Sequence, residues 1–450
     1  MNKGVIMGLF LLAIFPARAF AVGSGGFENA SFSSKFLAEG NAGVAQANEP
    51  GAISYNPAGI TELHGLQTQT NTHFINVFVF HHGRLDDRTR SSGTIVPVPT
   101  GYMTLNPDGH FGNRLSFGIG SDSPFGLANK FDANDANVRY AGYKNYLKMY
   151  TIKPVAALRI NDKLSIGAGP IYYRVFDFGG IEAYPNRLFP GGLVTDGQVR
   201  LNLEGNRWRW HLGALYKPHP KHRFGFYFRS PVTINTRGRV KVENATSGNF
   251  ETGANAKLDL PLNFTWGYAY QWTPKTIVET DFGFTRWEAH KRLYINNDPV
   301  NTRENTILRA LGIVDKDYDN SFSLHLGGNH QKTEKLNLRA GSFFYTHAVP
   351  NDHYIPAVAD NNKIGFSAGA GYRVMKNMDL ELGYINIFNL GRRIDNSIGE
   401  SLGASEDGTY YGYIQQFVIT FTCRWENLFG WDGTKNETPE ILGNSEPETS

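Results

Sequence analysis

Hydrophobic and polar side chains alternate with a period of two along most of this 450-residue chain. Side chains of a β-strand point to opposite faces in turn, so the pattern predicts strands with one apolar and one polar face. We therefore expect an all-β fold with about 14 strands. The predicted strands are residues 66–81, 95–106, 114–124, 145–160, 163–178, 198–217, 222–242, 256–272, 276–295, 320–331, 335–346, 363–374, 377–392 and 409–425.

The last predicted strand carries an almost continuous aromatic and aliphatic face. An apolar face of this kind is favourable against lipid, and closure of the sheet into a barrel pairs the backbone groups that hydrocarbon would leave unsatisfied. A soluble β-sandwich shares the alternation but does not easily explain so many long strands. The residues of this face are Tyr411, Tyr413, Phe417, Ile419, Phe421 and Trp425.

The connections between the predicted strands alternate between short and long. The short connections, at 106–109, 161–162, 218–220, 273–275, 333–334 and 375–376, carry turn formers or charge. In outer-membrane barrels short turns face the periplasm and long loops face outside, so an even strand number places both chain ends in the periplasm. Residues 66–425 are thus predicted to form a transmembrane antiparallel β-barrel.

Composition agrees with a barrel and narrows the class of partner. Aromatic residues make up 13% of the chain and Gly numbers 50, although the mean hydropathy is only -0.36. A barrel has this weak apolar signal per strand. The net charge of +3 gives no reason to propose nucleic acid as a partner, and a single cysteine, Cys423, excludes an internal disulfide.

The two ends of the chain have compositions of their own. Residues 1–21 contain one Lys, an apolar run and the site Ala19-Phe20-Ala21, which predicts a cleaved secretory signal peptide. Residues 426–450 are polar and contain Pro and several acids, so we expect a flexible periplasmic tail. Trp425 would then serve as the aromatic strand end in assembly.

Residues 22–65 precede the first strand and lack its alternation, and they carry Asn56-Pro57-Ala58. The segment FSSKFLAEGNAGVAQANEPGAISYNPAGITEL resembles the N-terminal hatch of FadL-type outer-membrane transporters for long-chain fatty acids and other hydrophobic compounds. The resemblance implies that residues 22–65 form a plug inside the barrel. It extends to the segments SFGIGSDSPFGLANKF, GNRWRWHLGALYKPHPKHRFGFYFRSPV, LDLPLNFTWGYAY and IPAVADNNKIGFSAGAGYRV.

The third predicted strand is interrupted at Ser123, Pro124, Phe125 and Gly126. Proline cannot donate to a sheet ladder, so this sequence predicts a bulge or break in the wall. In the family, an inward kink of this strand implies a lateral opening from the lumen into the bilayer. The alternative is that Pro124 merely ends the strand before a long loop.

The resemblance also implies where a ligand binds. The predicted apolar lining comprises Phe27, Phe32 and Phe36 in the hatch, and Phe125 and Leu127 at the kink. These side chains would alternatively pack the plug against the wall.

The resemblance further implies that Arg174 and Arg292 hold a carboxylate, because both lie in strands resembling those that supply basic carboxylate ligands in the family. Arg can bind a carboxylate through paired hydrogen bonds. The alternative is that both arginines are solvated side chains of the lumen that pair with neighbouring acidic residues and bind no ligand.

Two connections are unusually apolar for exposed loops and are predicted to form the outer capture surface. They are residues 179–197, with Ile181, Tyr184, Leu188, Phe189, Leu193 and Val194, and residues 301–315, with Ile307, Leu308, Leu311 and Ile313 at roughly helical spacing. The alternative for residues 301–315 is a helix that is only a lid packed on the barrel mouth.

These features predict passive uptake of long-chain fatty acids, with a hatch shift and lateral release. Neutral aromatic or alkane hydrocarbons are the alternative substrates, and a nonspecific porin or a barrel enzyme is a further alternative. The sequence has no phosphate-binding loop, and His81-His82 lacks the companions of a metal site, so neither ATP nor a cofactor is expected. The other expected partners are outer-membrane lipid, lipopolysaccharide and the barrel assembly machinery, around a monomer.

Overall fold

The computed structural model describes residues 23–83, 88–93, 95–107, 114–135, 138–184, 195–245, 248–302, 304–305, 308, 313–398 and 406–425. The predicted signal peptide and the predicted tail lie outside these residues. So do Leu188, Phe189, Leu193, Val194, Ile307 and Leu311 of the two apolar loops.

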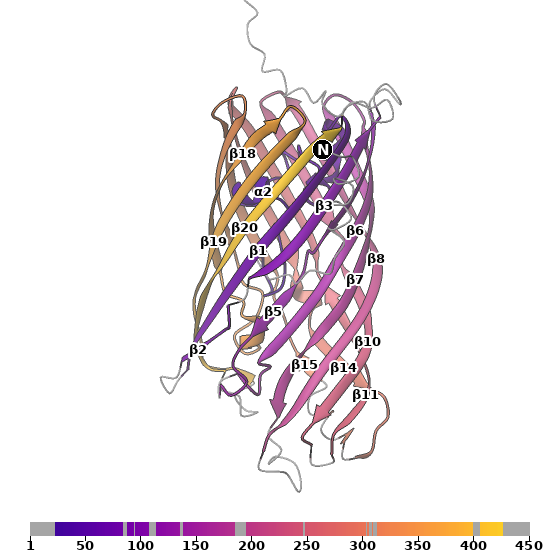
Figure 1. The fold of residues 1–450 in the computed structure, drawn as a ribbon, viewed down its shortest axis with the longest axis vertical. Coiled ribbons are helices and arrows are strands. Elements are labelled where there is room, and N and C mark those ends of the chain that lie inside the picture. Colours follow the sequence, from indigo (N-terminus) through magenta and orange to yellow (C-terminus); the bar gives the residue numbers. More distant parts are fainter. Residues whose placement is uncertain are drawn as a thin grey trace, which may run out of the picture.

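Antiparallel strands close into one barrel of 14 strands (Figure 1), which confirms the predicted fold class. The first and last strands pair along their whole lengths, from Leu66 opposite Trp425 to Gly83 opposite Gly408, and this ladder closes the sheet. The strand segments are β1 (Gly65–Gly83), β2 (Arg88–Arg90), β3 (Val96–Asn106), β4 (Leu115–Asp122), β5 (Leu127–Lys130), β6 (Lys144–Arg159), β7 (Leu164–Tyr184), β8 (Gly197–His219), β9 (His222–Arg229), β10 (Val232–Glu243), β11 (Phe250–Leu260), β12 (Leu262–Thr273), β13 (Thr276–Arg286), β14 (Arg292–Asn297), β15 (Ile313–Asp315), β16 (Ser321–Gln331), β17 (Leu336–Tyr345), β18 (Lys363–Met375), β19 (Met378–Ile394) and β20 (Gly408–Trp425).

Some strands predicted as continuous are divided in the structure. β9 and β10 are separated at Ser230 and Pro231, and β11 and β12 at Pro261. Proline has no N–H to give to the ladder, so each break falls where a strand hydrogen bond is lost. β13 and β14 are separated by the 3-10 turn η4 (Trp287–Ala289), which points the Trp287 side chain inward, where it is fully buried.

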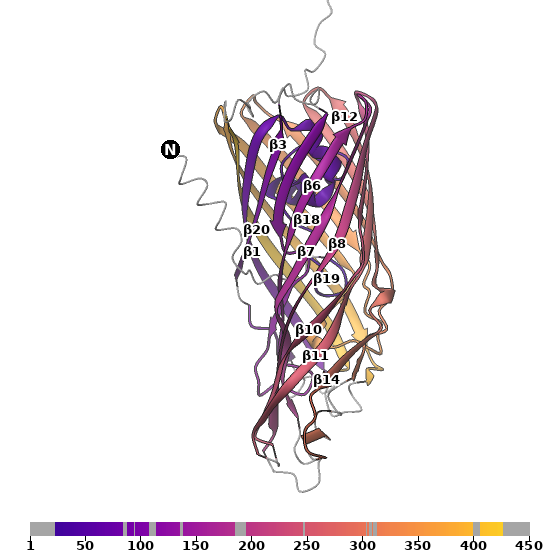
Figure 2. The same ribbon diagram turned by 90° about the vertical axis from the view of Figure 1, so that its right-hand side faces the viewer.

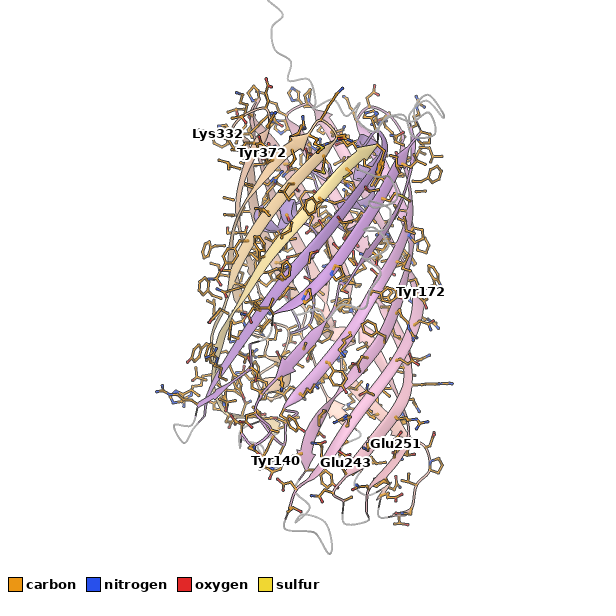
Figure 3. All side chains as sticks on the ribbon, in the orientation of Figure 1. Tyr140, Tyr172, Glu243, Glu251, Lys332 and Tyr372 are labelled. Carbon is orange, nitrogen blue, oxygen red and sulfur yellow. The ribbon has the colours of Figure 1, made fainter. Side chains whose placement is uncertain are left out.

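The two faces of the wall differ as the alternation predicts. In β9, Phe224 is 44% exposed, whereas Tyr227 and Arg229 are only 5% and 4% exposed and face the lumen. Figure 3 shows Tyr172 and Tyr372 on the outside of the wall. The outer face is therefore aromatic and aliphatic, and the inner face carries most of the polar groups. Among the described residues, no helix is long and apolar enough to cross a membrane.

The segment from residue 23 to residue 63 lies inside the barrel, toward the end that carries the short connections (Figure 2). We call this segment the hatch and the two ends of the barrel the turn end and the loop end. The hatch contains α2 (Ser34–Ala38), α3 (Ala52–Tyr55) and η1 (Pro57–Glu62).

Hydrogen bonds to acidic side chains of the wall and ion pairs hold the hatch against the wall. Glu279 and Asp281 of β13 accept hydrogen bonds of 2.6–3.1 Å from the four consecutive backbone amides of residues 43–46. Glu62 pairs with Arg223 of β9 and with Lys217 of β8. Burial alone would raise the pKa of Glu62, but these two cations lower it to about 2, so this anchor keeps its charge at neutral pH.

Candidate functional site

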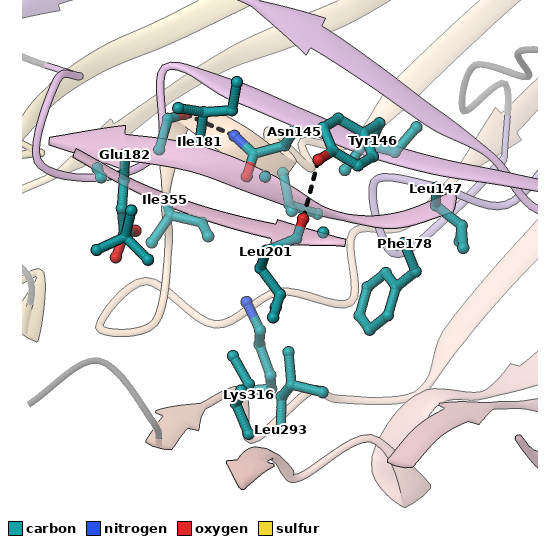
Figure 4. A pocket seen from close by; sticks show the side chains of 18 of the residues that line it. Asn145, Tyr146, Leu147, Phe178, Ile181, Glu182, Leu201, Leu293, Lys316 and Ile355 are labelled. Carbon is teal, nitrogen blue, oxygen red and sulfur yellow. Dashed lines mark hydrogen bonds between the residues drawn. The ribbon is translucent and has the colours of Figure 1, made fainter. Parts of the chain in front are cut away.

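A cavity of about 490 Å³ lies on the loop-end side of the hatch, between the barrel wall and the inner ends of the loops (Figure 4). Most of its lining is aliphatic or aromatic, and it comes from the hatch, from the wall strands β5, β6, β7, β8, β10, β11 and β14, and from segments between strands. Representative lining residues are Phe27, Leu127, Phe178, Leu201, Leu293 and Ile355. A concave apolar site of this size accommodates a small hydrophobic molecule.

The floor of the cavity is a cluster of aromatic rings. Phe27 of the hatch meets Trp287 edge to face, with ring centroids 4.9 Å apart, and lies 6.2 Å from Phe125. The indole N–H of Trp287 donates to the hydroxyl of Ser24 at 2.8 Å, so the ring is oriented by a hydrogen bond to the hatch. A ligand could pass this floor only if the hatch moved.

The wall is interrupted between β4 and β5, at residues 123–126. β4 ends at Asp122 and β5 begins at Leu127, and Ser123 donates its hydroxyl to the carbonyl of Met149 on β6 at 2.5 Å. β3 pairs with β4 only along Gly101–Leu105, and among the described residues no ladder joins β3 to β5. The backbone of the wall is therefore unpaired on one side of the kink.

The hatch supplies the missing partner. The amide of Asn29 donates to the carbonyl of Pro124 at 2.8 Å, and the amide of Gly126 donates to the carbonyl of Phe27 at 2.7 Å. Glu28 and Phe125 form an antiparallel bridge between these two bonds. Phe27 thus belongs to the cavity floor, and the segment 27–29 that carries it seals the break in the wall, so one movement of this segment would open both.

Phe27 and Leu127 are the predicted lining residues that line this cavity. Phe125 is buried behind Phe27 in the aromatic floor. Phe32 and Phe36 pack instead with Tyr55 in the core of the hatch, because α2 and α3 fold against each other. Their predicted roles in ligand binding remain predictions.

The two arginines predicted to hold a carboxylate do not line the cavity. Arg174 shares the outer face of β7 with Tyr172 and pairs with Glu204. Arg292 is exposed on β14, whereas its neighbour Leu293 lines the cavity. Alternation explains both placements, since a shift of one residue along a strand moves a side chain to the opposite face.

Lys316 is the cation that the cavity does contain. Among the described lining residues it carries the only ammonium or guanidinium group, and its side chain points into the cavity (Figure 4). Burial lowers the pKa of this amine to about 8, and Glu406 nearby opposes the shift. The sequence offered one signal for it, a lysine directly after the apolar loop 301–315.

The Asn56-Pro57-Ala58 motif docks the hatch onto the wall. The Asn56 amide donates to the carbonyls of Val44 and Ala214, each at 2.8 Å, and its oxygen accepts from the Ala58 amide at 3.1 Å. Gly213 of β8 lies so close that a Cβ there would come within 2.1 Å of the Asn56 side-chain oxygen. The motif is therefore a structural contact in this chain, at the turn end of the hatch.

Within the described ranges, no group of three or more His, Cys, Asp or Glu side chains could hold a metal ion.

A closed barrel with a folded plug and an apolar cavity defines a class, the plugged outer-membrane transport barrel. The family model described as outer membrane protein transport protein (OMPP1/FadL/TodX) matches residues 17–423. The chain belongs to this family, which places it in the bacterial outer membrane and among transport proteins rather than enzymes.

Relatives of similar length support the assignment. The long-chain fatty acid transport protein of Escherichia coli O6:H1 is 25% identical, over 85% of this chain and 90% of that protein. Outer membrane protein P1 of Haemophilus influenzae is 23% identical, over 85% and 89% of the two chains.

Solved structures share the fold. A FadL homologue of Pseudomonas aeruginosa superposes with a TM-score of 0.77 at 17% identity, covering 88% of this chain and 99% of that one. The Pseudomonas putida toluene transporter TodX gives 0.66 at 14% identity, with the same coverage.

Proposed function

We propose that this protein takes up long-chain fatty acids passively, with release sideways into the outer membrane at the kink. The observation that carries the proposal is the double role of the segment 27–29: its Phe27 lies in the floor of the apolar cavity, and its backbone seals the break between β4 and β5. A ligand that displaces this segment opens a path from the cavity to the bilayer. An alkyl chain on that path avoids the aqueous periplasm.

The size and lining of the cavity support an apolar chain as substrate. Each buried methylene is worth about 0.8 kcal/mol, so affinity accumulates quickly with chain length. Release is then the harder step, and direct transfer from an apolar cavity into lipid keeps the chain out of water throughout. The sequence has no nucleotide-binding loop, so the movement runs down a gradient.

Lys316 favours an acid over a neutral hydrocarbon. Lys316 is the only ammonium or guanidinium group among the described lining residues, so it is a partner for a carboxylate, and hydrogen bonds to charged groups are stronger than neutral ones. The Escherichia coli relative is named for long-chain fatty acids, whereas TodX is titled a toluene transporter. Neutral aromatic hydrocarbons are therefore the second candidate, supported by the predominantly apolar lining.

Replacement of Lys316 by Met is expected to weaken oleate binding by about 1.5–3 kcal/mol and to leave dodecane binding nearly unchanged. Oleate affinity of the natural protein should also fall as the pH rises through about 8, because the Lys316 amine then loses its proton. Equilibrium binding of labelled oleate to the purified barrel, with and without the substitution, measures both effects.

Lys291→Met is the matched control, because exposed Lys291 accepts a backbone hydrogen bond from Lys316 but does not line the cavity. Equal losses in the two variants would remove the case for a carboxylate at Lys316.

Uptake in cells tests the function itself. Cells in which this protein is the only transporter of hydrophobic compounds are given labelled oleate, dodecane or a small sugar. Oleate uptake well above that of cells lacking the protein supports the proposal. Uptake of dodecane or toluene alone would replace the fatty acid by a neutral hydrocarbon, and equal uptake of the sugar would contradict a plugged channel.

A further inference from the structure

A second, smaller cavity lies on the other side of the aromatic floor. Its volume is about 60 Å³, enough for a few water molecules or a carboxylate head. In contrast to the large cavity, its lining is mostly polar, with Glu28, Asn29, Arg229, Asn263, His325 and Tyr345 among the side chains. The large and small cavities are thus an apolar and a polar compartment separated by the hatch near residues 27–28.

The charged pair of this polar cavity is buried. Arg229 of β9 donates to a carboxylate oxygen of Glu28 at 3.0 Å, and the two side chains are only 5% and 6% exposed. The other carboxylate oxygen of Glu28 accepts from Ser24 at 2.8 Å. The Nε atom of Arg229 is buried and has no hydrogen-bond partner, so the guanidinium can donate a further hydrogen bond to an oxygen of a ligand.

The guanidinium lies directly behind the floor of the large cavity. It stacks over the ring of Phe125 at 4.7 Å from the centroid, and Phe125 in turn contacts Phe27. Phe27 and Glu28 are adjacent residues, one lining each cavity. A movement of residues 27–29 that takes Glu28 out of hydrogen-bond reach of Arg229 breaks this ion pair.

Such a movement would leave an unpaired cation in a buried site. Losing one partner of a buried ion pair is strongly unfavourable, because the remaining charge has neither water nor a counterion. A second anion that takes the place of Glu28 removes this penalty. The carboxylate of a fatty acid is an anion that arrives at this place from the adjoining cavity.

We propose that Arg229 is a transit site for the carboxylate of the ligand, which replaces Glu28 on the guanidinium and so releases residues 27–29 from the kink. This inference rests on the proposed function and specifies how an acid, rather than a neutral hydrocarbon, opens the hatch. A ligand can shift the hatch only if it binds more tightly to the protein with the hatch released from the kink than to the protein with the hatch in place. Arg229 is thus a positioning residue, which binds Glu28 of the hatch in one state and the ligand carboxylate in the other.

The test compares labelled oleate with labelled dodecane in cells that depend on this protein for both. Arg229→Gln should lower the ratio of oleate to dodecane uptake at least about tenfold, because the buried cation is gone. Arg229→Lys should restore part of that ratio. Glu28→Gln keeps the cation without its partner, so purified protein of this variant should bind oleate more tightly than the natural protein does.

Arg223→Gln is the matched control. Arg223 also lies on β9 and also pairs with a hatch carboxylate, Glu62, but it lines neither cavity. The substitution therefore loosens the hatch without touching the transit site, and it should leave the ratio of the two substrates unchanged.

Failure of the Arg229 transit site and failure of fatty acid uptake give different results. If the natural protein takes up oleate but Arg229→Gln lowers both substrates equally, or Arg223→Gln shifts the ratio as far, the pair is only a structural anchor. If the natural protein takes up neither substrate, the proposed function fails. If the Arg229→Gln variant does not reach the membrane, oleate binding by the Glu28→Gln variant tests the inference instead. Binding that is unchanged or weaker than that of the natural protein would contradict the replacement of Glu28 by the ligand carboxylate.

Discussion

A disulfide between residues 29 and 124 is expected to abolish oleate uptake while it is oxidised, and reduction is expected to restore it. Asn29 and Pro124 are opposite each other in the short antiparallel contact between the hatch and the kink. Opposed residues of a hydrogen-bonded pair have Cα atoms about 5.5 Å apart, a separation that suits a disulfide. The bond would hold residues 27–29 on the kink and keep the cavity floor in place.

The variant is Asn29→Cys with Pro124→Cys, made in a chain where the single native cysteine, Cys423, is replaced by Ser. The reduced form of the same protein is the control, since it carries every substitution but not the covalent link. Initial rates of labelled oleate uptake before and after treatment with a reductant give the comparison. If the fully oxidised protein takes up oleate as fast as the reduced protein does, the hatch need not leave the kink.

The replacement Asp122→Asn is expected to lower the free energy of unfolding of the barrel by about 3–5 kcal/mol. Asp122 ends β4 just before the kink and pairs with Lys153 of β6 at 2.6 Å, with both side chains essentially inaccessible to solvent. Its carboxylate also accepts hydrogen bonds from Ser54 of the hatch and from Thr151. The substitution leaves Lys153 buried without its counterion.

Denaturant unfolding of the purified barrel, refolded into vesicles, measures this loss. The double replacement Asp122→Leu with Lys153→Met removes both charges and should recover most of the stability, since apolar side chains of similar volume often replace a buried pair without loss. A double variant as unstable as Asp122→Asn would show that hydrogen bonding to Ser54 and Thr151, rather than the ion pair, stabilises this joint.

The strands could be predicted from the sequence because each strand obeys a local rule. Alternation with period two identifies the face that meets lipid, as Phe224 on β9 illustrates. The turn-forming residues of the short connections mark where the strands end. Interruptions such as η4 could not be predicted in this way. Trp287 turns inward there because it packs on Phe27, a residue about 260 positions earlier in the chain.

The site was less accessible to sequence reasoning because it depends on register and on long-range packing. Arg174 lies on the outer face, one residue away from the lumen-facing Tyr173. Lys316 reaches the cavity because β15, directly before it, pairs with β14, the strand that carries the lining residue Leu293. Arg229 was visible as an alternating polar residue, but its partner Glu28 is about 200 positions away. The tail, the signal peptide, a monomeric state and contacts with lipopolysaccharide and the assembly machinery stay predictions.

The central claim, lateral release at the kink, is tested most directly by straightening the wall. Residues 123–126 are replaced by an alternating strand sequence of equal length, with the hatch left intact, and insertion of the folded barrel is checked first. We expect oleate uptake to fall to the level of cells that lack the protein, because β3 and β5 would then pair and close the opening. Uptake at the natural rate through a straightened strand would contradict lateral release.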